Sequence, residues 1–176
     1  MLERLARLRV ALGFVCGVFV FWLAAPTGPS LAWGVPLAAC GEALRIWAAG
    51  HLNKSREVTS SGPYQWLAHP LYVGSSVIGI GLAVAAGSRV VAGLIAVYLG
   101  VTLTAAIRSE EAFLRRTFGG RYDSYRREGA VDRARRFSFA QAMANREYRA
   151  LVGFALAVLL LVLKATFNGS FGGKGG

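Results

Sequence analysis

Four ionisable or aromatic residues flank two apolar runs and are spaced so that they could form one site. His69 and Tyr72 stand where the chain enters an apolar run, and Glu110 and Glu111 follow directly after the next one. If the two runs form antiparallel helices, these side chains meet at the same surface. Carboxylates in such a place can bind a cationic group through charge-assisted hydrogen bonds. The spacing therefore predicts a functional site at that end of the helix pair.

Two charged residues lie inside an apolar run. Glu42 and Arg45 are three residues apart, which places them on one face of a helix. Charges at that depth are costly unless they are paired or face a cavity. Arg45 is close enough to the end of its run to extend its head group toward water. The residues leave a structural ion pair and a role in ligand binding equally open.

Glycines interrupt the apolar run that contains Tyr72. Gly74 and Gly81 are seven residues apart and share a helix face, and Gly79 lies between them. Their missing side chains would let a neighbouring helix or a flat ligand approach closely. The sequence leaves both interpretations open.

The elements that must position these residues are membrane helices. Hydrophobic residues make up 55% of the 176 residues while the formal net charge is +11, and the two properties are separated along the chain. A span needs about 20 mainly apolar residues, with about 17 acceptable. We expect an all-α polytopic membrane protein, a single domain over 1–176, with about five transmembrane helices. The expected spans are 10–25, 31–50, 71–87, 90–107 and 151–167.

The positively charged residues predict the orientation of the chain. They precede the first run, lie between the second and third, and are densest in the segment 108–150 between the fourth and fifth. Because positively charged loops stay cytoplasmic, we expect the N-terminus inside and the C-terminus outside. The basic segment either binds anionic lipid head groups or serves as a topology determinant. Nucleic acid is a poor fit, since no recognition fold is indicated.

Other segments allow further predictions. The first run could be a signal peptide, but Pro26 and the immediate start of the next run favour a retained helix. The stretch 110–127 repeats aromatic and apolar residues every three to four positions, which predicts an amphipathic cytoplasmic helix over the site, kinked at Gly119-Gly120. The glycine-rich tail 168–176 is expected to be flexible. The cysteines and histidines show no metal-ligand spacing.

An ordered series of motifs resembles one known family. The series comprises Gly62-Pro63-Tyr64, His69-Pro70-Leu71-Tyr72-Val73-Gly74, Gly79-Ile80-Gly81, Glu110-Glu111-Ala112-Phe113-Leu114 and Tyr122-Asp123-Ser124-Tyr125. In this order the motifs resemble the isoprenylcysteine carboxyl methyltransferase and phospholipid methyltransferase family of integral membrane enzymes. The segments 45–48 and 145–148 look like its bacterial branch, which implies a bacterial inner membrane.

The resemblance implies a methyltransferase that uses S-adenosylmethionine, releases S-adenosylhomocysteine and takes a lipophilic substrate from the bilayer, with membrane lipids as partners. The cofactor pocket that it implies consists of Tyr64, His69, Pro70, Tyr72, Gly79, Gly81, Glu110, Glu111, Tyr122 and Tyr125. No catalytic residue is assigned; Arg45, His69 and Glu111 are candidates, and no metal is expected. Methyl transfer is an in-line displacement, so positioning matters more than a nucleophilic triad.

Two other functional classes remain as alternatives. Membrane sterol reductases share a related helical core and bind a nicotinamide cofactor such as NADPH, but the adjacent Glu110 and Glu111 match the methyltransferases better. A non-catalytic lipid-binding or transporter-like protein would explain Glu42 and Arg45 but not the crowded motifs. The sequence does not identify the acceptor. Gln65 and Ala68 stand where the family often has arginines or other polar residues, a departure that bears on the identity of the substrate.

Overall fold

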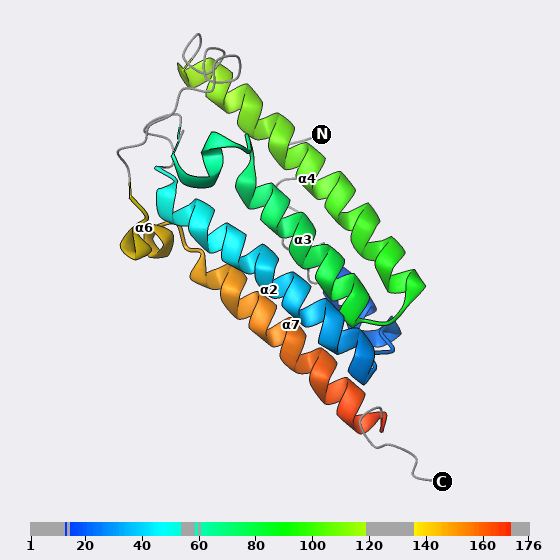
Figure 1. The fold of residues 1–176 in the computed structure, drawn as a ribbon. Coiled ribbons are helices and arrows are strands. Elements are labelled where there is room, and N and C mark those ends of the chain that lie inside the picture. Colours follow the sequence, from blue (N-terminus) through cyan, green and yellow to red (C-terminus); the bar gives the residue numbers. More distant parts are fainter. Residues whose placement is uncertain (1–12, 14, 54–58, 60, 119–135, 170–176) are drawn as a thin grey trace.

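A computed structural model of the chain describes residues 13, 15–53, 59, 61–118 and 136–169. All the secondary structure in these ranges is helical (Figure 1), which confirms the expected all-α class for this part of the chain. Residues 15–23 form a first helix. The helices that follow are α2 (Gly28–His51), the 3-10 helix η1 (Gly62–Gln65), α3 (Pro70–Ala85), α4 (Arg89–Phe118), α6 (Phe139–Ala144) and α7 (Tyr148–Phe167).

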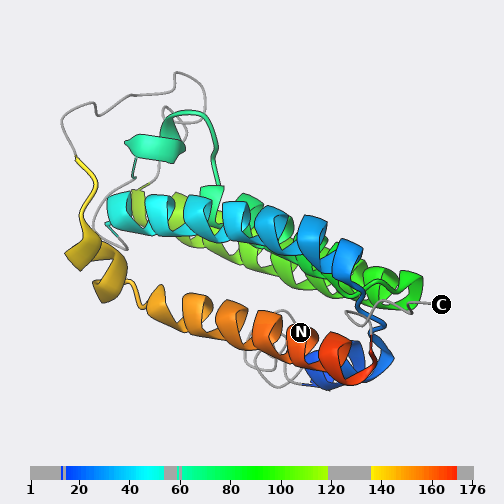
Figure 2. The same ribbon diagram turned by 60° about the horizontal axis from the view of Figure 1, so that its bottom comes forward.

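The long helices form one array in which the chain direction alternates. α3 lies between α2 and α4, and α7 runs along the other side of α2 (Figure 1). α6 lies beside the C-terminal end of α2, and α7 returns from there toward the helix 15–23 (Figure 2). The array has a hairpin end, where the turns 24–27 and 86–88 lie, and an opposite end, called here the polar end, where α3 and α7 begin.

Capping and inter-turn hydrogen bonds hold the hairpin end. Thr27 and Ser30 form a reciprocal capping box at the start of α2. The Ser30 hydroxyl also lies 3.0 Å from the carbonyl oxygen of Ala85, to which it donates. The amide of Ala25 donates to the carbonyl of Ala86 at 2.8 Å. These bonds join the two short turns to each other.

The same end contains a buried apolar cluster and an anchor for α7. The cluster consists of Ala24, Leu31, Ala85, Ala86, Val91, Leu161 and Ala165. The Lys164 ammonium of α7 donates to the carbonyl oxygens of Phe21 and Trp22 at 2.6 and 2.8 Å. These carbonyls belong to the end of the helix 15–23, where such groups lack intrahelical partners. Small apolar side chains and backbone groups thus build the hairpin end.

Glycines let α3 pack against its neighbours at very short range. A Cβ atom added at Gly81 would lie 2.4 Å from the amide nitrogen of Ala38 on α2, and one added at Gly79 would lie 2.2 Å from Cδ1 of Leu99 on α4. Neighbouring helices therefore cover the open faces of both glycines. Helix packing, one of the two interpretations left open by the sequence, accounts for them without a ligand; their place in a cofactor pocket stays a prediction.

Two of the described helices are long and apolar enough to cross a membrane. They are Arg89–Ala112 within α4 and Tyr148–Phe167, with mean hydropathies of 2.3 and 2.4. α3 is apolar but has only 16 residues. Each of the five apolar runs predicted from the sequence contains a helix, and the largest difference in the bounds is at the end of α4, which reaches Phe118 where the span was expected to end at 107. Membrane helices are thus supported, while the count of five spans stays a prediction.

α4 does not stop where the predicted fourth span ends. It continues through Glu110 and Glu111 to Phe118 as one helix of 30 residues. The apolar run and the first part of the stretch 110–127 are therefore a single rod. The predicted kink at Gly119-Gly120 lies outside the described residues, as does the end of the glycine-rich tail from 170 onward.

Candidate functional site

His69 lies between two glutamates at the polar end. Its Nδ1 atom is 3.7 Å from Oε2 of Glu110, and its Nε2 atom is 3.5 Å from Oε1 of Glu111. The Tyr72 ring is tilted against the imidazole, with 5.7 Å between ring centroids. His69 begins α3 and the glutamates lie on α4, so the antiparallel pair brings together the four residues expected to meet. We call them the His69 cluster.

The chain before α3 explains why His69 takes this position. η1 begins with Gly62 in a left-handed conformation, φ +58°, followed by Pro63. Pro70 then occupies the first turn of α3, where a missing N–H costs nothing. The carbonyl of His69 accepts the amides of Tyr72 and Val73 at 3.0 and 3.1 Å. His69 is therefore the N-cap residue of α3, and its side chain makes no capping hydrogen bond.

The remaining residues expected in the pocket fall into three groups. Tyr64 on η1 and Pro70 at the start of α3 are buried. Gly79 and Gly81 lie two to three helical turns after Pro70 on α3 and face other helices. Tyr122 and Tyr125 lie outside the described residues.

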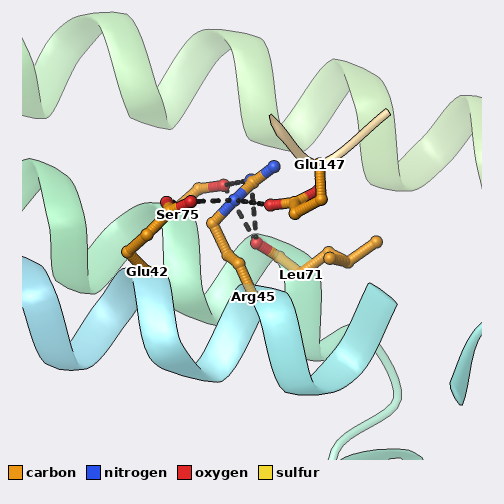
Figure 3. Close-up of polar contacts among 5 residues, drawn as sticks. All are labelled: Glu42, Arg45, Leu71, Ser75 and Glu147. Carbon is orange, nitrogen blue, oxygen red and sulfur yellow. Dashed lines mark hydrogen bonds and ion pairs between the residues drawn. The ribbon is translucent and has the colours of Figure 1, made fainter. Parts of the chain in front are cut away.

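A second polar cluster surrounds Arg45 on α2 (Figure 3). Its Nε donates to Oε1 of Glu147 at 2.7 Å. One terminal nitrogen, Nη1, donates to the carbonyl of Leu71 at 3.4 Å and to the hydroxyl of Ser75. Glu42, the partner expected from its spacing, is 3.9 Å away. Arg45 thus connects α2 with the first turns of α3 and with the start of α7; we call this group the Arg45 cluster.

Glu42 is the unusual member of the Arg45 cluster. Its side chain is 3% exposed, and neither carboxylate oxygen has a hydrogen-bond partner among the residues that the structure describes. The carboxylates of Glu42 and Glu147 both lie near the Arg45 guanidinium. Glu147 makes the shorter contact, although it is far from Arg45 in the sequence. The ion-pair interpretation of Arg45 is therefore supported, with a different principal partner from the one expected.

The short helix α6 positions Glu147. The Asn145 side-chain amide donates to the carbonyls of Ala49 and Leu52 at 2.8 Å each, which satisfies free acceptors at the C-terminal end of α2. Arg146 then adopts a left-handed conformation, φ +61°, and α7 starts after Glu147. Sequence reasoning missed this role of Glu147. Its only signal was the motif 145–148, which gives no indication of a contact 102 residues away.

The His69 cluster has the charge and exposure of a binding site for a cationic group. Its two carboxylates are 40% and 26% exposed, so a ligand can reach them, and their negative charge favours an ammonium group. No group of three His, Cys, Asp or Glu side chains within the described ranges is placed to hold a metal ion. The arrangement suits recognition of a charged small molecule, with rings on one side.

Comparison with known protein families gives a match that covers the middle part of the chain. Residues 30–121 match the family described as phospholipid methyltransferase. The matched region contains nearly all of α2 and the whole of η1, α3 and α4, and therefore the whole His69 cluster; Glu147 lies outside it.

Two curated bacterial proteins share part of this sequence. The nickel-cobalt-cadmium resistance protein NccN of Alcaligenes xylosoxydans xylosoxydans is 36% identical over 96 residues, which cover 53% of this chain and 43% of that protein. The cobalt-zinc-cadmium resistance protein CzcN of Cupriavidus metallidurans is 34% identical over 87 residues, which cover 48% and 39%. The alignments thus span less than half the length of these relatives. No solved structure matches the chain.

Proposed function

This chain belongs to the phospholipid methyltransferase family, and from that premise we propose that it transfers a methyl group from S-adenosylmethionine to a lipophilic or amphiphilic acceptor at a membrane. The observation that carries the proposal is the position of Glu110 and Glu111 on either side of His69, at 3.7 and 3.5 Å. Two adjacent carboxylates on one rigid helix, facing the start of another, form a negative site inside the family-matched region.

The His69 cluster suits the cofactor by charge. S-adenosylmethionine carries an ammonium and a sulfonium group, and carboxylates bind ammonium groups by strong, charge-assisted hydrogen bonds. We assign Glu110 and Glu111 to the amino group, while Tyr72 offers a ring face to a cation. When bound, the cofactor supplies an electrophilic methyl group. The protein has to hold both reactants in line and keep water out.

The membrane arrangement is part of the same proposal. We assign five membrane helices to 15–23, α2, α3, α4 and α7, with the polar end and the basic segment 108–150 on the cytoplasmic side. Large apolar side chains that face outward support this assignment; Trp33 on α2 is 78% exposed and Phe167 on α7 is 87% exposed. The acceptor then approaches the His69 cluster from the bilayer, and the cofactor approaches from water.

Binding of the product to charge-neutral variants tests the site. Glu110→Gln and Glu111→Gln keep the side-chain shape and remove one charge, so the affinity for S-adenosylhomocysteine should fall about tenfold or more. Isothermal calorimetry on the folded protein in detergent measures it. Arg116→Gln, which changes one exposed charge farther along the same helix, is the control and should bind as the parent does. Parent-like binding by both glutamate variants would show that the pair is structural.

A second measurement separates this function from a nicotinamide-dependent reductase. A ligand that binds only the native state raises its melting temperature by mass action. S-adenosylmethionine and S-adenosylhomocysteine should therefore stabilise the protein in detergent, and NADPH should have little effect, because adjacent carboxylates repel its phosphates. Stabilisation by NADPH alone would reject the methyltransferase and favour the reductase.

A further inference from the structure

The start of α3, which supplies His69 and Tyr72 to the His69 cluster, has no side-chain cap. Its N-cap residue, His69, makes no side-chain capping hydrogen bond. Besides its own backbone hydrogen bonds, this part of α3 is contacted by Arg45 on α2, which donates to the Leu71 carbonyl and to the Ser75 hydroxyl. Ser75 in turn donates to the same carbonyl at 2.9 Å. A residue outside the His69 cluster thus contacts the part of α3 that directly follows His69.

Two glycines admit the Arg45 side chain to the backbone of α3. A Cβ atom added at Gly74 would lie 2.6 Å from Cγ of Arg45 and 2.8 Å from the carbonyl oxygen of Gly41. One added at Gly41 would lie 2.7 Å from the carbonyl oxygen of Gly74. The two helices are thus in close backbone contact within two turns after His69, and the Arg45 side chain lies against Gly74 there.

Glu147 decides which way the guanidinium points. At 2.7 Å it holds Nε, while Glu42 lies 3.9 Å from the same atom and has no hydrogen bond among the described residues (Figure 3). Glu42 is therefore a second acceptor within reach on the same helix as Arg45. Without the Glu147 carboxylate, the guanidinium gains more by turning toward Glu42, and its bonds to α3 weaken.

We propose that Glu147 and Arg45 are positioning residues for the cofactor site: Glu147 holds Arg45 against the start of α3, and Arg45 holds His69 between Glu110 and Glu111. The start of α7 thereby contributes to a site that it does not touch. This inference rests on the proposed function for its affinity readout, but its structural readout is independent of any cofactor.

The test compares two ways of loosening α7. Glu147→Gln removes the anchor at the polar end, and Lys164→Met removes the anchor to Phe21 and Trp22 at the hairpin end. Ser75→Ala, a milder change, removes one Arg45 contact without touching α7. For each variant we measure the melting temperature, the affinity for S-adenosylhomocysteine, and amide hydrogen exchange in the peptide 69–75, which reports local opening of α3.

Glu147→Gln and Ser75→Ala should weaken binding by about threefold to thirtyfold, the range found for residues that act on a site through others. Both should also speed exchange in the peptide 69–75. Lys164→Met should lower the melting temperature but leave affinity and exchange in that peptide close to those of the parent. Adding Glu42→Gln to Glu147→Gln removes the competing acceptor and should restore part of the lost affinity.

Unchanged affinity and unchanged exchange in Glu147→Gln, at a lowered melting temperature, would overturn the inference and leave a purely structural ion pair. An equal loss of affinity in Lys164→Met would also overturn it, because general loosening of α7 would then explain the effect. If the parent binds no S-adenosylhomocysteine, the proposed function fails, and the exchange measurement alone decides the positioning role.

Discussion

The hairpin end and the polar end of the same helices are held together by different chemistry. At the hairpin end, small apolar side chains, a capping box and backbone carbonyls make the contacts. At the polar end, charged and amide side chains make them, through the His69 cluster, the Arg45 cluster and Asn145. Apolar packing is rigid and not selective, whereas polar contacts can be exchanged for contacts with a ligand. On the proposed function, contacts for stability and contacts for recognition are thus built at opposite ends.

The largest effect expected from this contrast is loss of the fold by a change near the hairpin end. A Cβ atom at Gly34 would lie 2.3 Å from the amide nitrogen of Ala85 and 2.5 Å from the carbonyl oxygen of Gly81. Gly34→Val should therefore separate α2 from α3 and destabilise the protein by about 3 kcal/mol or more. Monodisperse yield in detergent and the melting temperature measure it.

Gly153 supplies the matched control on α7, because nothing lies within 4 Å of a Cβ added there. Gly153→Ala should be neutral or slightly stabilising, since glycine costs about 0.5 to 1 kcal/mol relative to alanine inside a helix. If Gly34→Val were as stable as Gly153→Ala, close backbone contact would not be what holds the hairpin end.

An intermediate effect is expected at the polar end, where stability and binding should change together. Asn145→Ala removes one hydrogen bond to each of the carbonyls of Ala49 and Leu52, although Leu52 keeps the bond from Nε2 of Gln141 at 3.0 Å. Two lost hydrogen bonds, each worth about 0.5 to 1.5 kcal/mol, should cost about 1 to 3 kcal/mol. Because Asn145 fixes the turn before Glu147, the affinity for S-adenosylhomocysteine should also fall. A loss of stability with unchanged affinity would separate α6 from the site.

The smallest effect is expected where the polar end carries backbone strain. Arg146 has φ +61°, a conformation that glycine adopts freely and other residues adopt at a cost. Arg146→Gly should therefore change the free energy of unfolding by less than about 1 kcal/mol, because relief of strain is offset by greater freedom of the unfolded chain. Arg149→Gly, within helical α7, is the control and should destabilise by about 1 kcal/mol. Equal destabilisation of both would contradict the strain argument.

The sequence predicted the elements well because their signals are local. Apolar runs located the helices 15–23, α2, α3, α4 and α7, although α4 continues to Phe118, well beyond the predicted end of its span. The short turns implied antiparallel neighbours. The contact of His69 with Glu110 and Glu111 followed from that hairpin. Their role in binding remains a prediction, since the geometry gives proximity and charge but no ligand.

The contacts of α7 could not be predicted in the same way. Spacing along α2 favoured Glu42 as the partner of Arg45, but the shorter ion pair joins Arg45 to Glu147. That pairing depends on α6, whose six residues follow a basic segment without a clear apolar period. The neighbours of Gly79 and Gly81 likewise could not be predicted, because they depend on which helix packs against each glycine. A glycine in a helix indicates close approach but does not identify the group that approaches.

The shortness of α3 has a consequence for the depth in the bilayer at which the proposed acceptor would be bound. Its 16 residues span about 24 Å at 1.5 Å per residue, less than the hydrocarbon thickness of about 30 Å. In a chain oriented as proposed, with the turn 86–88 at one face of the bilayer, His69 lies several ångströms beneath the other face. An acceptor can then present its head group without leaving the leaflet. A change in bilayer thickness would change the depth of His69 through hydrophobic mismatch. The turnover rate should therefore depend on the thickness of the bilayer.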